Sequence, residues 1–290
     1  MANQSYNIKD VYSVFKKIDG YFGEKDAGNG GRVEHENSSI HQYCPYNSTF
    51  ESGFCMNYLY KASSGVINLL DNLKNYGLEY DKLAEYAILF LSYKLNQHSE
   101  HKYKSANLND FYTNHIGKNT FYDKKIKDNG PTYKNIIYQK KDLMDIKKIS
   151  KFNVLFSILF SFYNGIKSNN LDCTNLSQKA NEFAQNFEKL NDDSNINGNT
   201  SYSKLLSTLS DDYNHLKNNY DNNNSCNFPP LPKVKTPPSK LIPALSTVSV
   251  IPVFLGIAYK YSLFGIDKLF QRQYLRKKLK KVKKKLKLNI

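Results

Sequence analysis

Histidine and cysteine are the side chains in this 290-residue chain that could bind a metal ion. His35, His41 and Cys44 lie close together in the sequence, and His98 and His101 form a second group. Structural zinc sites combine cysteine and histidine in sets of four ligands with short, regular spacings, and neither group completes such a set. The chain also contains no Cys-x-x-Cys pair. We therefore expect surface or capping histidines, no metal site and no cofactor.

Paired acids are the groups that could act as acid and base catalysts. The pairs Asp192–Asp193 and Asp211–Asp212 fall in polar stretches at the ends of predicted helices, where solvated charge is the expected role. The chain lacks Gly-x-Ser-x-Gly and His-Glu-x-x-His, the motifs of serine hydrolases and zinc peptidases. We predict no catalytic residue, no small-molecule substrate and no enzyme activity.

The chain has four cysteines, which allow three pairings: Cys44, Cys55, Cys173 and Cys226. The first two would close a short loop and are the easier pair, which leaves the last two for each other. Disulfides persist in oxidising compartments, so this pairing depends on which side of a membrane the domain occupies. Buried free thiols are the alternative.

Helical periodicity dominates the chain from Met56 onward. An amphipathic helix precedes it near the N-terminus, with one apolar face formed by Val11, Val14, Phe15 and Ile18. Strand-type alternation is scarce. We therefore predict an all-α fold class, in which residues 1–222 form an ectodomain of seven or eight helices.

Two apolar runs need separate interpretation. Phe152–Tyr163 has 12 residues, too few to span a hydrocarbon core of ~30 Å, and predicts a buried central helix. Leu241–Tyr259 has 19 residues without a charge, which cover roughly 28 Å as a helix. Its two prolines are tolerated better in membrane spans than in soluble helices, and apolar residues continue to Ile266. We predict one C-terminal transmembrane helix over residues 241–266.

Proline and basic residues mark the segments on either side of this span. Residues 223–240 hold five of the nine prolines and are predicted to form an extended, semi-rigid stalk. Residues 267–290 form a short basic tail. From position 272 this tail carries ten cations and no acid: Arg272, Arg276, Lys277, Lys278, Lys280, Lys281, Lys283, Lys284, Lys285 and Lys287.

The charge distribution argues against nucleic acid as a partner. The formal net charge is +15, and ten of these charges lie in the tail, which leaves the body only mildly basic. A domain that binds a duplex usually carries a basic stripe on its folded face. Arginine, which reads guanine and phosphate best, occurs only at Arg32, Arg272 and Arg276.

The position of the basic tail beside the span assigns it to the membrane. Only Lys233, Lys235 and Lys240 flank the other end of the span, so the positive-inside rule predicts a cytosolic C-terminus and residues 1–240 across the membrane. Each lysine near an anionic leaflet contributes ~1 kcal/mol, and we predict anionic lipid headgroups as partners. An outward domain meets oxidising conditions, which makes Cys44–Cys55 and Cys173–Cys226 plausible disulfides.

A set of motifs runs from about residue 10 to the tail: HQYCPYN…SGFCMNYL, SSGVINLL, YGLEYDKLAEYAILFLSYKLNQ, NLNDFYTNHI, GPTYKNIIYQKKDLMDI, LDCTNLSQKANEFAQNFEKLNDDSNI, LLSTLSDDYNHLKN and IPVFLGIAYKYSLFG. These motifs resemble the Plasmodium interspersed repeat proteins, and more narrowly the Cir/Yir/Bir variant antigens of rodent malaria parasites. The last motif is the most specific. The chain departs from the family at Phe90, where a tryptophan is frequent.

This resemblance implies an α-helical ectodomain, one C-terminal span and export to the infected red cell or its surface. It also implies roles in antigenic variation, immune evasion and interaction with a host surface protein or an antibody. Our first hypothesis is therefore a single-pass, exported variant surface antigen. The alternative is an intracellular adaptor of parasite or vacuolar membranes, which acts through lipid and protein contacts without surface display.

Overall fold

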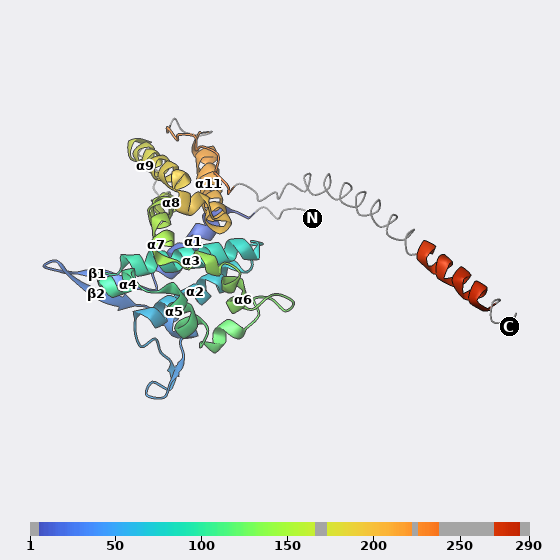
Figure 1. Ribbon diagram of the computed structural model, residues 1–290. Helices are drawn as coiled ribbons and strands as arrows, with labels where there is room; N and C mark the ends of the chain where they lie inside the picture. Colours follow the sequence, from blue (N-terminus) through green and yellow to red (C-terminus); the bar gives the residue numbers. More distant parts are fainter. Residues whose placement is uncertain (1–5, 166–172, 222–225, 238–269, 285–290) are drawn as a thin grey trace. The chain divides into compact units, whose positions relative to one another are not determined.

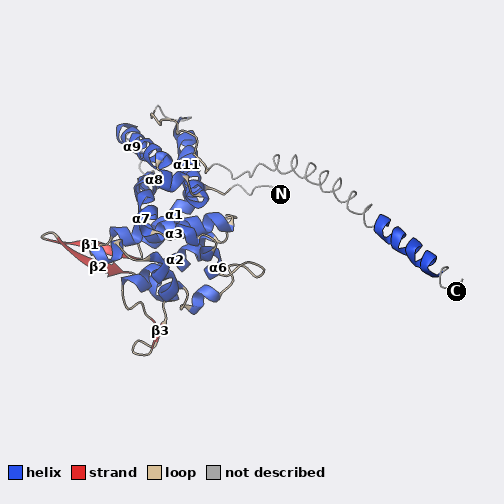
Figure 2. Cartoon of the chain, in the orientation of Figure 1, coloured by secondary structure: helices blue, strands red, loops and turns tan. Residues whose placement is uncertain are grey.

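The computed structural model describes residues 6–165, 173–221, 226–237 and 270–284, and they are mostly helical (Figure 1, Figure 2). The chain divides into two compact units, Met1–Pro237 and Pro238–Ile290. The transmembrane helix that we predicted over 241–266 lies outside the described residues. Among the residues that are described, no helix is both long and apolar enough to cross a bilayer.

The first unit contains a series of helices that follow the predicted amphipathic stripes. The α-helices are α1 (Ile8–Asp19), α2 (Tyr58–Leu73), α3 (Tyr80–Gln97), α4 (His101–Lys104), α5 (Leu108–Phe111), α6 (Tyr133–Tyr138), α7 (Ile146–Ile149), α8 (Asn153–Gly165), α9 (Cys173–Asp192), α10 (Ser194–Asn197) and α11 (Thr200–Asp221). Short turns of other helix types are η1 (Ser38–Tyr43), η2 (Tyr112–Ile116), η3 (Thr120–Asp123), η4 (Lys141–Leu143) and η5 (Ser150–Phe152). The predicted all-α fold of this unit is confirmed, although its described part contains eleven α-helices rather than the seven or eight that we expected.

Two small antiparallel hairpins interrupt the helices. Strand β1 (Phe22–Gly28) pairs with β2 (Gly31–Glu36), and β3 (Tyr46–Asn47) pairs with β4 (Ser52–Gly53). The first hairpin turns through Asn29, which has a positive φ, and through flanking glycines, because a tight turn needs residues that tolerate this conformation. Neither hairpin forms a larger sheet.

Asparagine begins many of the helices. The side chain of Asn57 accepts hydrogen bonds from the backbone N–H groups of Leu59 and Tyr60, at 3.0 and 3.3 Å, and so caps α2. The same arrangement occurs at η1, α1, α5 and η3, where the capping residues are Asn37, Asn7, Asn107 and Asn119. Asparagine is among the best N-cap residues because its oxygen satisfies amides that have no partner within the helix.

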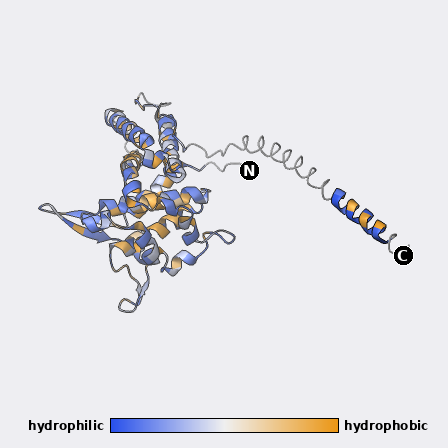
Figure 3. Cartoon of the chain, viewed as in Figure 1, coloured by the Kyte–Doolittle hydropathy of each residue, from blue (hydrophilic) through white to orange (hydrophobic). Residues whose placement is uncertain are grey.

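The core lies around α3, which packs against α2, α6 and α8. Figure 3 shows the apolar residues gathered inside the helical layers. The ring of Phe15 on α1 lies 5.4 Å from Tyr86 and 5.0 Å from Phe156, with both pairs edge-on, a favourable geometry for aromatic rings. Phe90 lies beside them, 5.8 Å from Phe15. The predicted burial of residues 152–163 is confirmed, because α8 packs its apolar face into this cluster.

Asp212 corrects our expectation that the acidic pairs are solvated. Its side chain is 0% exposed on α11, where it accepts hydrogen bonds from the hydroxyls of Tyr12 (3.0 Å) and Tyr86 (2.9 Å). The Lys82 ammonium lies 3.5 Å away. Burial raises the pKa of Asp212 above its ordinary value, although Lys82 and the tyrosines oppose this effect. The periodicity that placed α11 correctly did not reveal which of its polar residues faces the core.

Residues 226–237, which we call the strap, differ from the stalk that we predicted over residues 223–240. The strap is extended, as its prolines require, but it packs on the helical unit, so the domain boundary lies at 237 rather than 222. Phe228 is buried in the core. Two hydrogen bonds join Asn191 on α9 to the strap backbone, to the N–H of Lys235 (2.7 Å) and to the carbonyl of Lys233 (3.0 Å).

The described part of the second unit is one helix, residues 270–284. All of its side chains are exposed, and the large apolar ones are Phe270, Tyr274, Leu275, Leu279 and Val282. Eight of the ten predicted tail cations lie on this helix, whereas Lys285 and Lys287 fall outside the described residues. The tail is thus a basic helix with interspersed apolar residues.

Candidate interaction surface

The residues from Cys44 to Cys55, which we call the disulfide loop, form a small closed structure beside η1. The two cysteines are joined, with their Cα atoms 5.2 Å apart, and both are buried. The loop contains the β3–β4 hairpin, in which Tyr46 pairs with Gly53. A Cβ atom at Gly53 would lie 2.9 Å from the carbonyl oxygens of His41 and Cys44, so only glycine fits this close approach.

The second disulfide joins Cys173, at the first residue of α9, to Cys226, at the start of the strap. Their Cα atoms are 5.0 Å apart. Both predicted pairings are therefore present in the structure, and no described cysteine is free. The first bridge closes a local loop, whereas the second ties the strap to the helical unit.

Large apolar side chains, most of them aromatic, cover the outside of the disulfide loop and the residue that follows it. Tyr46 is 72% exposed, Phe50 53% and Met56 64%, although all three are large apolar groups. Phe54 connects this exterior to the domain, because it stacks on Phe50 at 4.1 Å and on His41 at 4.8 Å. Exposed apolar side chains that gather in one place mark interaction sites more often than scattered ones do, and aromatic residues are enriched in the centres of interfaces.

A hollow of about 700 Å³ lies between the disulfide loop and η3. Most of its lining comes from η1 and the loop, and the opposite wall comes from η3; the residues are Ser38, His41, Gln42, Cys44, Pro45, Tyr46, Phe50, Ser52, Gly53, Phe54, Thr120 and Phe121. No lysine, arginine, aspartate or glutamate lines it. The loop therefore offers an aromatic and weakly polar concave surface, which is suited to a protein side chain rather than to a charged metabolite.

Charged residues hold the neighbouring β1–β2 hairpin against α2 and α3. The Lys61 ammonium contacts the carboxylates of Glu34 (2.8 Å) and Glu36 (2.6 Å). His98 lies 3.3 Å from Glu34 through its Nε2 atom. Burial opposes the ionisation of Glu34, but the hydrogen bonds from Lys61 and His98 outweigh it and lower the pKa of Glu34.

These contacts correct our view of the histidines as surface residues. His98 is buried, whereas His101 is exposed. His35 lies on β2 with its Nδ1 atom buried, and burial lowers its pKa. His41 faces the disulfide and is part of the candidate surface. His98 and His101, which are close in the sequence, thus differ in burial.

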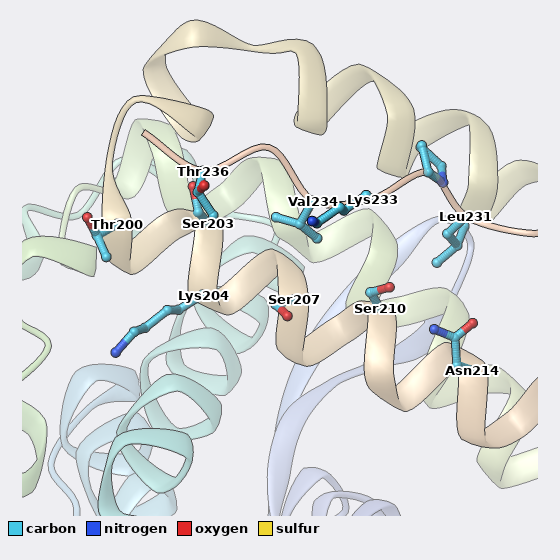
Figure 4. Close-up of a pocket in the computed structure, with 11 residues that line it drawn as sticks. Thr200, Ser203, Lys204, Ser207, Ser210, Asn214, Leu231, Lys233, Val234 and Thr236 are labelled. Carbon is cyan, nitrogen blue, oxygen red and sulfur yellow. The ribbon is translucent and has the colours of Figure 1, made fainter. Parts of the chain in front are cut away.

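A second hollow, of about 520 Å³, lies between α11 and the strap (Figure 4). Its helical wall carries polar side chains, and its strap wall is mostly apolar; the residues are Thr200, Ser203, Lys204, Ser207, Ser210, Asn214, Leu231, Pro232, Lys233, Val234 and Thr236. Because Leu231 and Val234 also pack against the core, we assign this hollow to the seam where the strap docks.

Sequence reasoning missed the aromatic surface. The signal was present in HQYCPYNSTFESGFCM, where four aromatic residues fall close to or between two cysteines. Hydrophobic periodicity assigns such residues to a core, and a loop this short has no period from which exposure could be predicted.

The family model described as Plasmodium variant antigen protein Cir/Yir/Bir matches residues 12–260. A solved structure, described as a Plasmodium PIR protein ectodomain, is 32% identical, with a TM-score of 0.56. The alignment covers 78% of this chain and 100% of that one. No curated protein matches the chain significantly.

Proposed function

The chain belongs to the Plasmodium Cir/Yir/Bir family of variant antigen proteins, and we propose that it is a single-pass membrane antigen that is exported to the infected erythrocyte. In this proposal the helical unit is displayed to the host, where it takes part in antigenic variation, immune evasion and host interaction. Family membership supports the antigen role broadly. Display and host contact are the parts that need a test.

The membrane part of the proposal rests on the sequence and on the tail helix. Residues 241–266 have the length and composition of a span, and the exposed basic helix at 270–284 is suited to an anionic leaflet. The larger number of cations after the span favours a cytosolic C-terminus.

Contact with a host partner is the second part, and one observation carries it. The disulfide loop exposes Tyr46 and Phe50, and the exposed Met56 directly follows it, whereas the residues around them are held by a disulfide, a hairpin and ring stacking. Rigid aromatic groups lose little conformational entropy on binding. We infer that this loop is the contact surface for a host surface protein or an antibody.

Localisation tests display directly. Antibodies against the helical unit and against the tail are applied to intact and permeabilised infected cells, and intact cells are treated with protease. For a surface antigen, the helical unit is stained and cleaved without permeabilisation, whereas the tail is stained only after it. If both epitopes need permeabilisation and protease leaves the chain intact, the alternative role as an intracellular membrane adaptor replaces display.

The tail cations test topology separately. The seven lysines to be replaced by glutamine are Lys277, Lys278, Lys280, Lys281, Lys283, Lys284 and Lys285. We expect the variant to remain in carbonate-washed membranes, because an apolar span inserts stably without lipid attraction, while a fraction of the molecules inverts. Release of the variant into the soluble fraction would show that 241–266 is not a span.

Substitutions in the disulfide loop test the contact surface, and an exposed tyrosine elsewhere in the domain provides the control. Tyr138 on α6 is 56% exposed but lies outside the disulfide loop. Residues 1–237 carrying Tyr46→Ser and Phe50→Ser should bind intact erythrocytes or anti-ectodomain antibodies at least tenfold more weakly than the parent, since aromatic residues dominate interface energies. Tyr138→Ser should bind like the parent. Equal losses in both variants would remove the loop from the contact surface.

A further inference from the structure

The outer edge of β2 is open to another strand. The β1–β2 hairpin stands out from the helices (Figure 1) and forms a sheet of only two strands, so each strand has one edge without a neighbouring strand. In the described part of the chain, no backbone group outside the hairpin hydrogen-bonds to the backbone of residues 31–36. Five of these six residues are exposed. Such an edge is a template for pairing with a further strand.

The hydrogen bonds within the hairpin show which backbone groups of β2 face outward. The Asn37 N–H donates to the Tyr21 carbonyl at 2.7 Å, which makes this pair hydrogen-bonded. Pairs in an antiparallel ladder alternate between hydrogen-bonded and non-hydrogen-bonded, so every second residue back along β2 has the same state. The backbone groups of Val33 therefore face β1, whereas those of Arg32 and Glu34 face outward.

The outer edge of β1 is less open than that of β2. The pairing register of β1 is irregular between Asp26 and Gly28, and Lys25 is exposed. Bulges and lysines are the devices by which proteins prevent edge pairing. Helices α1 and α3 also pack against β1. We therefore expect a further strand to pair with β2.

A second copy of β2 can pair with this edge in one register that matches charges. Outward-facing groups must lie opposite outward-facing groups, which restricts the two-fold axis of an antiparallel pair to a residue position. With the axis at Val33, Arg32 of each copy lies opposite Glu34 of the other. An axis at Arg32 or at Glu34 places like charges opposite each other, and an axis at His35 places Glu34 opposite Glu36. Opposite charges across strands stabilise a pair, and like charges destabilise it.

The side chains in this register are accessible. Arg32 is 58% exposed, and its guanidinium is held only by Glu24 at 3.7 Å. Val33 is 54% exposed. Glu34 is 34% exposed and makes two side-chain hydrogen bonds, whereas a carboxylate offers about four acceptor sites. It can therefore accept a guanidinium from a second copy without losing its present partners.

We propose that two copies of the chain associate edge to edge through β2, as one antiparallel sheet in the order β1–β2–β2–β1. The two-fold axis passes beside Val33, where the two valine side chains meet. On either side of them, Arg32 of one copy pairs with Glu34 of the other, and the backbones of these residues exchange about four hydrogen bonds in all. A contact of this size is transient in solution. The proposal depends neither on surface display nor on the disulfide loop.

A thiol at the two-fold axis tests the association in the full-length chain in detergent. The native cysteines are joined in disulfides, so Val33→Cys adds a single free thiol. The two introduced thiols would lie in a non-hydrogen-bonded pair, with Cα atoms about 4.5 Å apart, a separation that a disulfide can bridge. With copper phenanthroline and oxygen as oxidant, we expect a covalent dimer on non-reducing gels, and mass spectrometry of the linked peptide identifies the bond.

Lys25→Cys is the matched control, because Lys25 is exposed and pairs with Val33 across the hairpin but lies on β1. It should crosslink at least about tenfold more slowly, since its position is outside the range of disulfide geometry in the proposed dimer.

Charge variants test the register in the Val33→Cys background. Arg32→Glu places like charges opposite each other in both pairs and should slow crosslinking about tenfold. Arg32→Lys keeps the charge and should crosslink at nearly the same rate as Val33→Cys alone. In the unaltered chain, amide hydrogen exchange at Arg32 and Glu34 should slow as the protein concentration rises, whereas exchange at Val33, which is already bonded to β1, should change little.

Three results would overturn the proposal. Equal crosslinking of Val33→Cys and Lys25→Cys would indicate random collision. Arg32→Glu crosslinking as fast as its background would show that the charge pairs do not set the register. Amide exchange at Arg32 and Glu34 that is independent of concentration would show that copies of the chain do not cover this edge, which would leave it to a strand of another protein.

Discussion

Polar groups usually lie outside a protein and apolar groups inside, and two regions depart from this rule in opposite ways. One is the core around Asp212, and the other is the disulfide loop. In the core, a carboxylate is fully buried and satisfied by Tyr12 and Tyr86. In the loop, Tyr46 and Phe50 remain exposed although they are aromatic. A buried charge lowers stability unless its partners are in place, whereas exposed rings contribute little to stability. The first arrangement therefore specifies the fold, and the second is available to a partner.

Removing the buried carboxylate should give the largest change in stability. Asp212→Ala leaves two tyrosine hydroxyls and the Lys82 ammonium without their acceptor, and we expect a loss of about 3–5 kcal/mol in the free energy of unfolding. Urea unfolding of residues 1–237, followed by circular dichroism, measures this loss. Asp211→Ala is the matched control, because Asp211 is the exposed neighbour and should change stability by less than about 0.5 kcal/mol. Similar losses in the two variants would refute the distinction.

Loss of the Cys173–Cys226 disulfide should destabilise the protein more than loss of Cys44–Cys55. The Cys173–Cys226 bridge spans 53 positions and Cys44–Cys55 spans 11. The loop-entropy relation then gives losses of about 4 and about 3 kcal/mol when each pair is replaced by serine. Urea unfolding of the two double-serine variants beside the oxidised parent tests the order. A larger loss at Cys44–Cys55 would indicate that the short loop stabilises the native state by contacts rather than by chain entropy.

Acidification should change the contributions of Glu34 in the β1–β2 hairpin and Asp212 in the core to stability in opposite directions. The pKa of Glu34 is lowered from its ordinary value of 4.5, so the stability it contributes is present above pH 4.5 and is lost as the pH falls below that value toward the folded pKa. The pKa of Asp212 is raised above 3.8, so its ionisation weakens folding as the pH rises through that region.

Both contributions are measured by following Tm between about pH 3 and 7, the range in which carboxylates titrate. Glu34→Gln should flatten the loss of Tm on the acid side, because the group that titrates is gone. Asp212→Asn should steepen it, because the opposing contribution is removed. If both variants shift the profile in the same direction, the difference in burial does not control these groups.

The smallest effect on stability should come from the exposed rings. Phe50→Ala removes one stacking contact with Phe54 and should cost less than about 1 kcal/mol. Differential scanning calorimetry of residues 1–237 measures it. A loss as large as that of Asp212→Ala would mean that the loop is part of the folding core, and it would weaken the proposed role of the loop in binding.

Local patterns explain which features could be predicted from the sequence. Helices such as α2 and α8 carry their own apolar period, so their existence and burial follow from spacing alone. The even number of cysteines and the short interval between Cys44 and Cys55 were also sufficient to favour the observed pairing. These features depend on neighbours in the sequence.

The features that escaped prediction depend on distant residues. Asp212 is buried because Tyr12, 200 positions away, supplies a hydrogen bond. The prolines of the strap predicted its extended conformation, but not that Asn191 would bind its backbone. His41 gains Cys55 as a neighbour only after the hairpin forms. No local period contains this information.

The strap has a mechanical consequence. A pulling force applied from the C-terminal side enters the helical unit at Pro237 and first strains the hydrogen bonds that Asn191 makes with the strap. If these bonds yield, the tension reaches Cys226 and passes through the covalent bridge to Cys173. Helices α9, α10 and α11 lie inside the closed loop, so once the strap has detached they bear no load along their backbone. The bridge therefore shields these helices from shear.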